Sequence, residues 1–592
     1  MSKAFLVGKL MKHSLAVALL LIGAFFASDR VDAGDAKGVE SFFKANGIRC
    51  PNDKKQNGDF RLDTVAVSLF VGDLVADEVE AEAEKAVKTL RGNIVRDEKT
   101  ESNRITEVDL AKTPVNGVAL RKLAGLKGLH SLNISETRLA DGGIKGLAAF
   151  GSLQNLNLSH THVTDEGFKE LAGLINLRRL SLNGTQITDA GLKEFVALNS
   201  LQTLGLRHTD VTDVGLKELA GLQSIHDLDL SYTAVTDVGL KELASLKKLR
   251  TLDLSDTRVT DEGLKEFTSP RNLQNLNLAG TKVTGRGVKA IAGLIAVQNL
   301  DLSYTRITDE FLKEFVDLRG LQNLNLSHTQ VTGVGLEHLV SLKSLETLSL
   351  IRTPMTEIGL KGLARLDRLR SLDLSYSTLT DAGLKELTPL TCLNRLKLGH
   401  THVTDEGLKQ LASAKSLKSL DLSDTSVTVA GVSKLAESEN LQNLDLSSTQ
   451  VTGVGLRDLS GLKQLQTLSL RSAPVTDTGL KEVVLLKGLQ ILDLSFTQVT
   501  DRGLEELAEL KGLRNLSLRG TAVTDVGLKH LVQSESIRTL NVSFTRVTDL
   551  GLKEIAGFKS LQSLDLSFTQ VTDAGEARLR TALPALEIIR RK

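Results

Sequence analysis

A 24-residue period constrains the fold of this chain more than any other feature of its sequence. The threonine that ends the stretch LDLSYT, at Thr233, has counterparts every 24 residues from Thr113 to Thr569, with no insertion or deletion. Of these 20 positions, Ser377 and Ala473 alone depart from threonine. A fixed period of this length is typical of a solenoid, because one unit cannot bury its own apolar side and its neighbours must cover it. We therefore expect one continuous repeat array.

Each unit follows the pattern L-x-x-L-x-L-x-x-T-x-V-T-D-x-G-L-K-E-L-x-x-L-x-x. The alternation L-x-L predicts a short strand with one buried face. The threonine hydroxyl should bond backbone groups of the following turn, which would give a threonine ladder along the stack. Thr-Asp is a good N-cap for a short helix over G-L-K-E-L, and Asp fills its position in 14 of 20 units. The glycine two residues later, present in 18 of 20 units, predicts a close backbone approach or a tight start of the helix.

The stack should curve. Strands in a sheet lie about 4.8 Å apart, whereas packed helices lie about 8–10 Å apart, so the strands should form the inner side. We predict an α/β solenoid, a horseshoe or superhelix with a parallel sheet on its concave side and short helices on its convex side. The predicted segments are a signal peptide at 1–33, an N-terminal capping region at 34–104, the repeat array at 105–580 and a C-terminal cap at 581–592.

Both caps have local patterns of their own. An amphipathic pattern predicts a helix at about Asp77–Leu90, followed by a hairpin of Asn93–Arg96 with Ile105–Leu110. At the other end, Leu586–Ile589 is predicted to form a last strand. The basic residues 590–592 after it should act as a charged guard of the sheet edge.

The repeat strongly resembles the leucine-rich repeat. Its T-D-x-G-L segment is most similar to the cysteine-containing and ribonuclease-inhibitor-like subclasses, with threonine at the usual Asn or Cys ladder position, as in exported bacterial proteins of this kind. The resemblance covers about Ile105 to Arg580 and implies the solenoid fold. For function it implies partner binding without naming the partner. Some relatives carry an F-box and recognise substrates for ubiquitin ligases, but no F-box precedes this array.

The N-terminus has the form of a secretory signal. Lysines at positions 3, 9 and 12 precede an apolar run at Leu15–Ala27, and small residues around Ala33 suit cleavage. The run is short for a membrane span, which needs about 20 residues, although a retained anchor is the alternative. The two cysteines, Cys50 and Cys392, are too far apart along the stack for a disulfide. We therefore expect an exported protein of a bacterial envelope, periplasmic, at the cell surface or extracellular.

Charge and motifs argue against several functions. The formal net charge is +1, from 73 basic and 72 acidic residues, which gives no indication of nucleic-acid binding. No nucleophile–base constellation stands out, and the G-x-G pieces lack the third glycine of a dinucleotide fingerprint. The pair His160 and His162 has no obvious third ligand for a metal. We expect no enzyme activity, cofactor or metal.

One position of the unit varies while its neighbours are nearly constant. It lies two residues after the second leucine of L-x-L and holds every tyrosine of the chain. We call this set of positions the variable column and expect it on the concave rim, where aromatic and histidine side chains serve as anchors for a partner. The alternative is that they cover one another as a ladder. The candidate partner-binding residues are Tyr232, Tyr304, Tyr376, Phe496, Phe544, Phe568, His160, His208, His328, His400 and Arg352.

A second position, inside L-x-L, is often aspartate and forms a mildly acidic stripe that would favour a basic partner. The simpler interpretation is that these groups bond across neighbouring strands. Together these features predict a non-enzymatic solenoid that binds a protein through its concave face. The alternative function is a structural spacer or scaffold of the cell envelope.

Overall fold

The computed structural model describes residues 80–97, 104–267, 271–412, 414–532, 534 and 536–592. The predicted signal segment 1–33, Cys50 and most of the predicted N-terminal capping region lie outside them. The chain divides into two compact units, Met1–Asn157 and Leu158–Lys592, which are taken separately below.

The first unit begins, in its described part, with helical residues 80–89, inside the helix predicted at Asp77–Leu90. Strands β1 (Asn93–Arg96) and β2 (Ile105–Asp109) pair antiparallel. Glu80 ties the helix to this hairpin, because its carboxylate accepts from the Arg96 guanidinium at 3.0 Å and from the Ile105 amide at 3.2 Å. The unit continues with parallel strands β3 (Ser131–Asn133) and β4 (Asn155–Asn157), and with α5 (Gly117–Leu123), α6 (Asp141–Ile144) and the 3-10 helix η1 (Lys145–Ala149).

The second unit contains one parallel sheet in which each strand pairs with the next in the sequence. Its strands are β5 (Arg179–Ser181), β6 (Thr203–Gly205), β7 (Asp227–Asp229), β8 (Thr251–Asp253), β9 (Asn275–Asn277), β10 (Asn299–Asp301), β11 (Asn323–Asn325), β12 (Thr347–Ser349), β13 (Ser371–Asp373), β14 (Arg395–Lys397), β15 (Ser419–Asp421), β16 (Asn443–Asp445), β17 (Thr467–Ser469), β18 (Ile491–Asp493), β19 (Asn515–Ser517), β20 (Thr539–Asn541), β21 (Ser563–Asp565) and β22 (Glu587–Ile589). Every pairing shifts the register by a whole 24-residue unit, as when Leu228 lies opposite Leu252.

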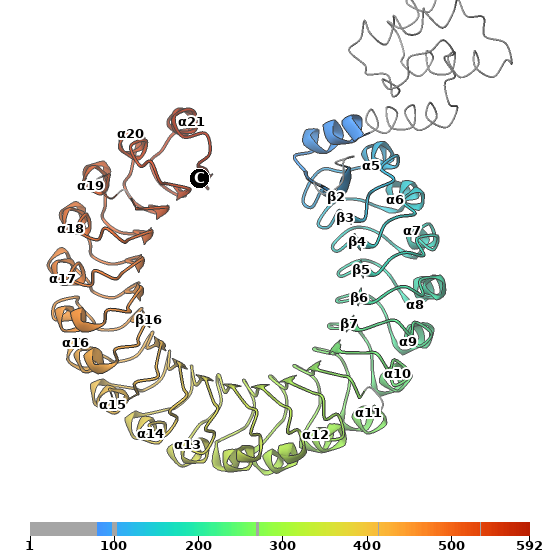
Figure 1. Ribbon diagram of the computed structural model, residues 1–592, viewed down its shortest axis with the longest axis horizontal. Coiled ribbons are helices and arrows are strands. Elements are labelled where there is room, and N and C mark those ends of the chain that lie inside the picture. The colour runs from blue at the N-terminus through green and yellow to red at the C-terminus, as the bar shows by residue number, and fades with distance from the viewer. Residues whose placement is uncertain (1–79, 98–103, 268–270, 413, 533, 535) are drawn as a thin grey trace, which may run out of the picture. The chain divides into compact units, whose positions relative to one another are not determined.

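A short helical segment follows each of the strands β5–β21, and α7 precedes β5. These segments are α7 (Asp165–Lys169), α8 (Asp189–Leu192), η2 (Lys193–Ala197), α9 (Asp213–Leu219), α10 (Asp237–Leu243), α11 (Asp261–Glu266), α12 (Gly285–Ile291), η3 (Asp309–Asp317), η4 (Val334–Ser341), α13 (Glu357–Leu363), α14 (Asp381–Lys385), α15 (Asp405–Leu411), α16 (Val429–Val432), η5 (Ser433–Glu437), η6 (Leu456–Gly461), α17 (Asp477–Val483), α18 (Asp501–Leu507), α19 (Asp525–Leu531), α20 (Asp549–Ile555) and α21 (Asp573–Ala582). Within this unit the strands line the inner side of an arc and the helices the outer side (Figure 1). The predicted α/β solenoid with an inner parallel sheet is confirmed. Several segments, labelled η, are 3-10 rather than the predicted α-helices.

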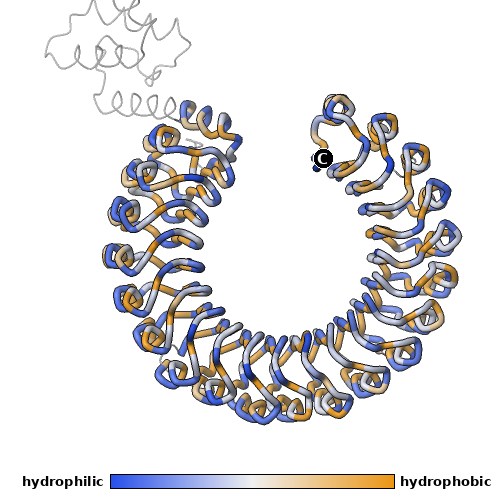
Figure 2. The backbone as a smooth tube through the Cα atoms, turned by 180° about the vertical axis from the view of Figure 1, so that it is seen from behind, coloured by the Kyte–Doolittle hydropathy of each residue, from blue (hydrophilic) through white to orange (hydrophobic). Residues whose placement is uncertain are grey.

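The core consists of aliphatic side chains that repeat with the sequence period. In one unit Leu228, Leu230, Val235 and Leu240 are all at most 2% exposed. Burial of each such side chain stabilises the fold by about 1.5–3 kcal/mol, so the stack of units supplies the core that one unit lacks. Figure 2 shows the same result as a change of hydropathy within every coil: none is hydrophobic or hydrophilic throughout.

The recurrent threonine closes the turn after each strand. The Thr233 hydroxyl donates to the Leu230 carbonyl three residues earlier at 2.6 Å, and every equivalent position except Ala473 makes the same bond. The predicted threonine ladder is therefore a column of identical turns. Each hydroxyl bonds within its own unit and not to the threonine of the next.

Successive units are connected by the aspartate of T-D-x-G-L. Asp213 accepts from the amide of Thr236 at 2.7 Å and from its hydroxyl at 2.6 Å, one unit further on. Thr236 in turn is the N-cap of α10, since its side chain accepts from the Val238 amide. Of the two residues of the predicted Thr-Asp cap, the threonine is thus the N-cap, and the aspartate of the preceding unit holds that threonine. A Cβ on Gly239 would lie 2.5 Å from Asp213 Oδ1, which explains the recurrent glycine as a close approach.

The same contact explains the exceptional unit that carries Phe311 in the glycine position. The preceding unit has Gly285 in place of aspartate, and a Cβ there would lie 1.9 Å from the Cβ of Phe311. The two exceptions are therefore complementary in shape. Thr308, deprived of its aspartate, keeps a buried hydroxyl with no hydrogen-bond partner among the described residues.

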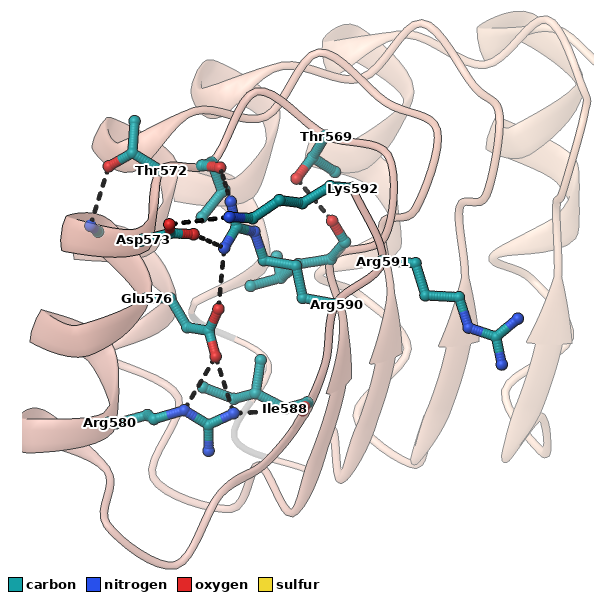
Figure 3. Close-up of polar contacts among 12 residues, drawn as sticks. Thr569, Thr572, Asp573, Glu576, Arg580, Ile588, Arg590, Arg591 and Lys592 are labelled. Carbon is teal, nitrogen blue, oxygen red and sulfur yellow. Dashed lines mark hydrogen bonds and ion pairs between the residues drawn. The ribbon is translucent and has the colours of Figure 1, made fainter.

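The C-terminal end of the second unit is held by ion pairs. Arg590 contacts Asp573 at 2.6 Å and Glu576 at 3.1 Å, and Lys592 contacts Asp573 at 2.8 Å (Figure 3). Hydrogen bonds from Lys592 first and then from Arg590 lower the pKa of the Asp573 carboxyl to about 2. The idea that residues 590–592 simply guard a sheet edge needs correction for Arg590 and Lys592, because both are bound to α21. Arg591 alone extends away from this cluster.

Candidate partner-binding surface

The variable column has an unusual backbone. All of its non-glycine residues have φ between 52° and 60°, and its three glycines have φ between 65° and 68°. This left-handed conformation costs an L-residue about 1–2 kcal/mol, and only Gly, Asn and Asp adopt it routinely. Asp256, Asp424 and the glycines suit it, but Tyr304 and Phe496 do not. The aromatic side chains are thus kept where the backbone disfavours them.

The turn that presents the column is fixed by the residues of LDLSYT. The Asp229 carboxylate accepts from the Ser231 amide at 3.0 Å and from its hydroxyl at 2.6 Å. Thr233 closes the other side, and the Tyr232 amide donates to the carbonyl of Ser255 in the next unit at 2.9 Å. The aspartate of the expected acidic stripe therefore closes a turn. Bonds across strands also occur, as from Asn277 to Asp253 at 2.9 Å.

Neighbouring side chains of the column lie against one another. Tyr304 stacks on His328 with ring centroids 4.0 Å apart, and Tyr376 stacks on His400 at 3.9 Å. Each of the three tyrosines contacts the next unit but none contacts another tyrosine, because they are three units apart. His160 lies over Gly184, where a Cβ would come within 2.4 Å of its ring. The ladder interpretation is thus correct for contacts inside the column.

The stacked rings nevertheless keep a large part of their surface in solvent. The exposed fractions are 46% for Tyr232, 62% for Tyr304 and 45% for Tyr376, and Phe496, Phe544 and Phe568 fall between 42% and 47%. Side chains that stack on each other and still face water are rigid, so they lose little conformational entropy on binding. Ladder packing and partner contact are therefore compatible.

Arginines from two positions cover the aromatic rings. Arg352, within the column, lies over Tyr376 at 4.7 Å from the guanidinium carbon to the ring centroid. Arg207 lies over Tyr232 at 4.4 Å, and Arg519 lies over Phe544 at 4.3 Å, both from the position just before the column. These distances are within the range of cation–π attraction. Sequence analysis missed this second set because serine dominates its position.

Two members of the column have perturbed acidity. A hydrogen bond to the Asp256 carboxylate raises the pKa of the Tyr232 phenol, so this ring stays neutral. Burial against its neighbours lowers the pKa of His328, with a smaller effect from the Arg352 charge. Both effects favour the neutral form of His328. His400, by contrast, places Nδ1 2.5 Å from the Asp424 carboxylate.

Beside the column, the inner face of the sheet forms a shallow groove over β8–β12 with a volume of about 330 Å³. Its floor carries a chain of amides: Asn323 donates to Asn299, Asn299 to Asn275, and Asn275 to the Thr251 hydroxyl. Most of the accessible lining of the groove is nevertheless apolar, and its charged lining residues are Asp253 and Asp301.

The described residues offer exposed contact surface at this site. Among the described residues, no group of three or more His, Cys, Asp or Glu side chains could hold a metal ion. None of the helices described has the length and apolar character needed to cross a bilayer. Cys392 is exposed and has no disulfide partner in the described part of the chain.

Comparison with family models identifies the repeat. A model of a leucine-rich repeat region matches residues 238–481. A model of the single leucine-rich repeat matches 152–172, 173–196, 197–220, 221–244, 489–508, 533–556 and 559–575. Together, with overlap counted once, the matches span more than half of the chain. The chain belongs to the leucine-rich-repeat proteins.

Several solved structures are similar to this chain, and one of them has a TM-score above 0.5. A complex of TLR13 with single-stranded RNA is 21% identical, covers 71% of this chain and 67% of that chain, and gives a TM-score of 0.52. An internalin from Listeria monocytogenes is 20% identical over 59% of this chain and 88% of its own, with a TM-score of 0.40. A Leptospira interrogans leucine-rich-repeat protein is 23% identical over 80% and 98%, with a TM-score of 0.35. A comparison with curated proteins gives no match.

Proposed function

We propose that this protein is an exported, non-enzymatic solenoid that binds a protein partner, with the variable column as its anchor. One observation carries the proposal: six large aromatic side chains are kept, half exposed, at backbone positions that favour Gly, Asn or Asp. A residue that costs stability and is not needed to fill the core is retained for another reason, and contact with a partner supplies one.

The arrangement supports binding by many modest contacts. Aromatic rings and arginines are the side chains most often found as anchors of protein interfaces, and here they are held rigidly by stacking. A protein partner suits this surface better than nucleic acid, because aspartates line the inner face beside it. TLR13, whose structure is a complex with single-stranded RNA, makes a direct test of nucleic acid worthwhile. Export rests on the sequence of residues 1–33.

The test is capture of partners by crosslinking from the native envelope or secreted fraction. The variant Tyr232→Asn, Tyr304→Asn, Tyr376→Asn removes the rings but suits the left-handed backbone, so the fold should be retained, as circular dichroism would check. The control is Val214→Ser with Val238→Ser, two exposed apolar residues on the outer helices.

A partner captured by wild type and by the valine control, but lost in the tyrosine variant, would establish the column as a binding site. Equal capture by all three would refute this role. In that case a spacer or scaffold, attached through its ends, would be the better description, and truncation of either end should then abolish its function.

A further inference from the structure

The last units of the array carry a row of arginines and phenylalanines, which we call the Arg–Phe strip. It consists of Arg471, Phe496, Arg519, Phe544, Phe568 and Arg591. The phenylalanines belong to the variable column, and the arginines occupy the position before it, where other units mostly have serine. Arg207 and Tyr232 form one similar pair elsewhere, but among the described residues only the last units repeat arginine and phenylalanine over several units.

The strip is one connected stack between Arg471 and Phe568. The Arg471 guanidinium lies 4.9 Å from the ring centroid of Phe496. Arg519 lies between two rings, 5.6 Å from Phe496 and 4.3 Å from Phe544. Phe544 then contacts Phe568, with ring centroids 4.5 Å apart. These distances place both guanidiniums within the range of cation–π attraction to the rings.

The two guanidiniums of the stack have unused capacity. Arg519 donates one long hydrogen bond, 3.3 Å, to the Ser543 hydroxyl. Within the described ranges neither Arg471 nor Arg519 has a carboxylate in ion-pair range. A guanidinium is always charged and offers five donors in a planar fork that matches a carboxylate. Arg591 at the end of the strip also projects away from the ion pairs of Arg590 (Figure 3).

Nearby carboxylates determine where on the surface an anion could lie. Asp493 and Asp565 are on the inner face of β18 and β21, and their Oδ1 atoms accept from the amides of Ser495 and Ser567. Their charges repel an acidic ligand from the inner face of the sheet. The Arg–Phe strip is then the place where such a ligand could bind. A nucleic-acid strand, with a phosphate at every nucleotide, would be harder to keep away from these aspartates than a peptide with a few acidic residues.

We propose that the Arg–Phe strip binds an acidic peptide segment of the partner, with carboxylates on Arg471 and Arg519 and apolar side chains on the phenylalanines. This rests on the proposed protein-binding function and specifies the chemistry of the partner. Arg471 and Arg519 are two units apart, which corresponds to about 10 Å. A polyproline II segment rises about 3.1 Å per residue with three residues per turn, so carboxylates at i and i+3 lie on one face at about this distance.

The experiment is fluorescence anisotropy of the whole protein with labelled synthetic peptides. The probe is Glu-Pro-Leu-Glu-Pro-Leu-Glu, compared with its Gln analogue, its Lys analogue and a scrambled isomer that destroys the spacing. A 12-nucleotide single-stranded RNA is the nucleic-acid probe. We expect the Glu peptide to bind, more weakly at high salt, and the Gln and Lys analogues to lose binding.

Two matched variants locate the site. Arg519→Gln should weaken the Glu peptide about tenfold or more, the effect expected for loss of one guanidinium–carboxylate contact. Arg538→Gln removes an exposed arginine one unit further along, outside the strip, and should leave the affinity unchanged. Circular dichroism checks that both variants fold.

Equal affinity for the Glu, Gln and Lys peptides, or equal loss in both variants, would overturn the proposal. So would tighter binding of RNA that depends on Arg519, which would assign the strip to nucleic acid. These outcomes leave the capture experiment with the tyrosine variant untouched. The failure of the strip and the failure of the general binding function can therefore be told apart.

Discussion

Replacement of one inter-unit aspartate should loosen the next unit in the chain. Asp213 accepts two hydrogen bonds from Thr236, at 2.7 Å and 2.6 Å. Bonds to a charged acceptor contribute about 1.5–3 kcal/mol each, and water replaces part of the loss at this half-buried site, so Asp213→Ala should cost about 2–4 kcal/mol. The loss should be local, because units of a solenoid contact only their neighbours.

Hydrogen exchange measured by mass spectrometry is the suitable assay, since a long repeat array need not unfold in a single transition. The amide of Thr236 should exchange roughly 30- to 700-fold faster, which is the stated free energy converted at 1.4 kcal/mol per tenfold. Asp210→Ala is the control, because it removes an exposed aspartate of the same turn. If peptides covering 230–245 exchange alike in the two variants, the aspartate does not hold the next unit and the reasoning fails.

Three further predictions follow from other contacts. Glu482 is buried, and its hydrogen bond with Arg457 lowers its pKa below the ordinary 4.5. The stabilisation of the fold by this ionised carboxylate is therefore present above about pH 4.5 and is lost as pH falls through the lower folded-state pKa. Thermal melts of wild type and Glu482→Gln should accordingly differ at pH 7 and converge in acid. Gly285→Asp alone should destabilise the fold by about 1–3 kcal/mol, because Phe311 fills the space that the new side chain needs. Gly285→Asp combined with Phe311→Gly should recover stability and give the Thr308 hydroxyl a partner. Denaturation of wild type and both variants tests this, and equal stability of the single and double variants would contradict it. Tyr304→Asn should leave stability unchanged or raise it by up to about 1 kcal/mol, since Asn tolerates the left-handed backbone; a clear loss of stability in denaturant would mean that the ring is needed for the fold.

The fold could be predicted from sequence because the chain repeats the same pattern once in each of its twenty units. The position of β7, the burial of Leu228 and Leu230 and the turn bond of Thr233 all follow from the period and from which side chains are apolar. The role of Asp213 could not be deduced in this way, because the residue it binds lies in the next unit. The pattern T-D alone is equally compatible with a cap inside its own unit.

The place of the variable column after each strand could be predicted from sequence, but its left-handed backbone could not, and its role as a binding site stays a prediction. The variation of the column marked Tyr232 and its equivalents, yet the alternation of Gly, Asp, Ser and His there was the available signal for positive φ. The arginines at 207, 471 and 519 were hidden because only the folded turn brings them over the rings of the following unit. Assignment of the repeat to a threonine subclass remains a prediction.

The aspartate contacts are not continuous along the second unit. They run unbroken from Asp165 to Thr284 and from Asp477 to Thr572. In between, Gly285, Gly333, Val429 and Gly453 interrupt them, and Glu357 replaces one aspartate and still bonds Thr380. We therefore expect the arc to bend most readily in this middle stretch, where contacts between successive units are missing. Bending there would change the distance between the tyrosines of the column and its phenylalanines. One chain could in this way close on partners of different width.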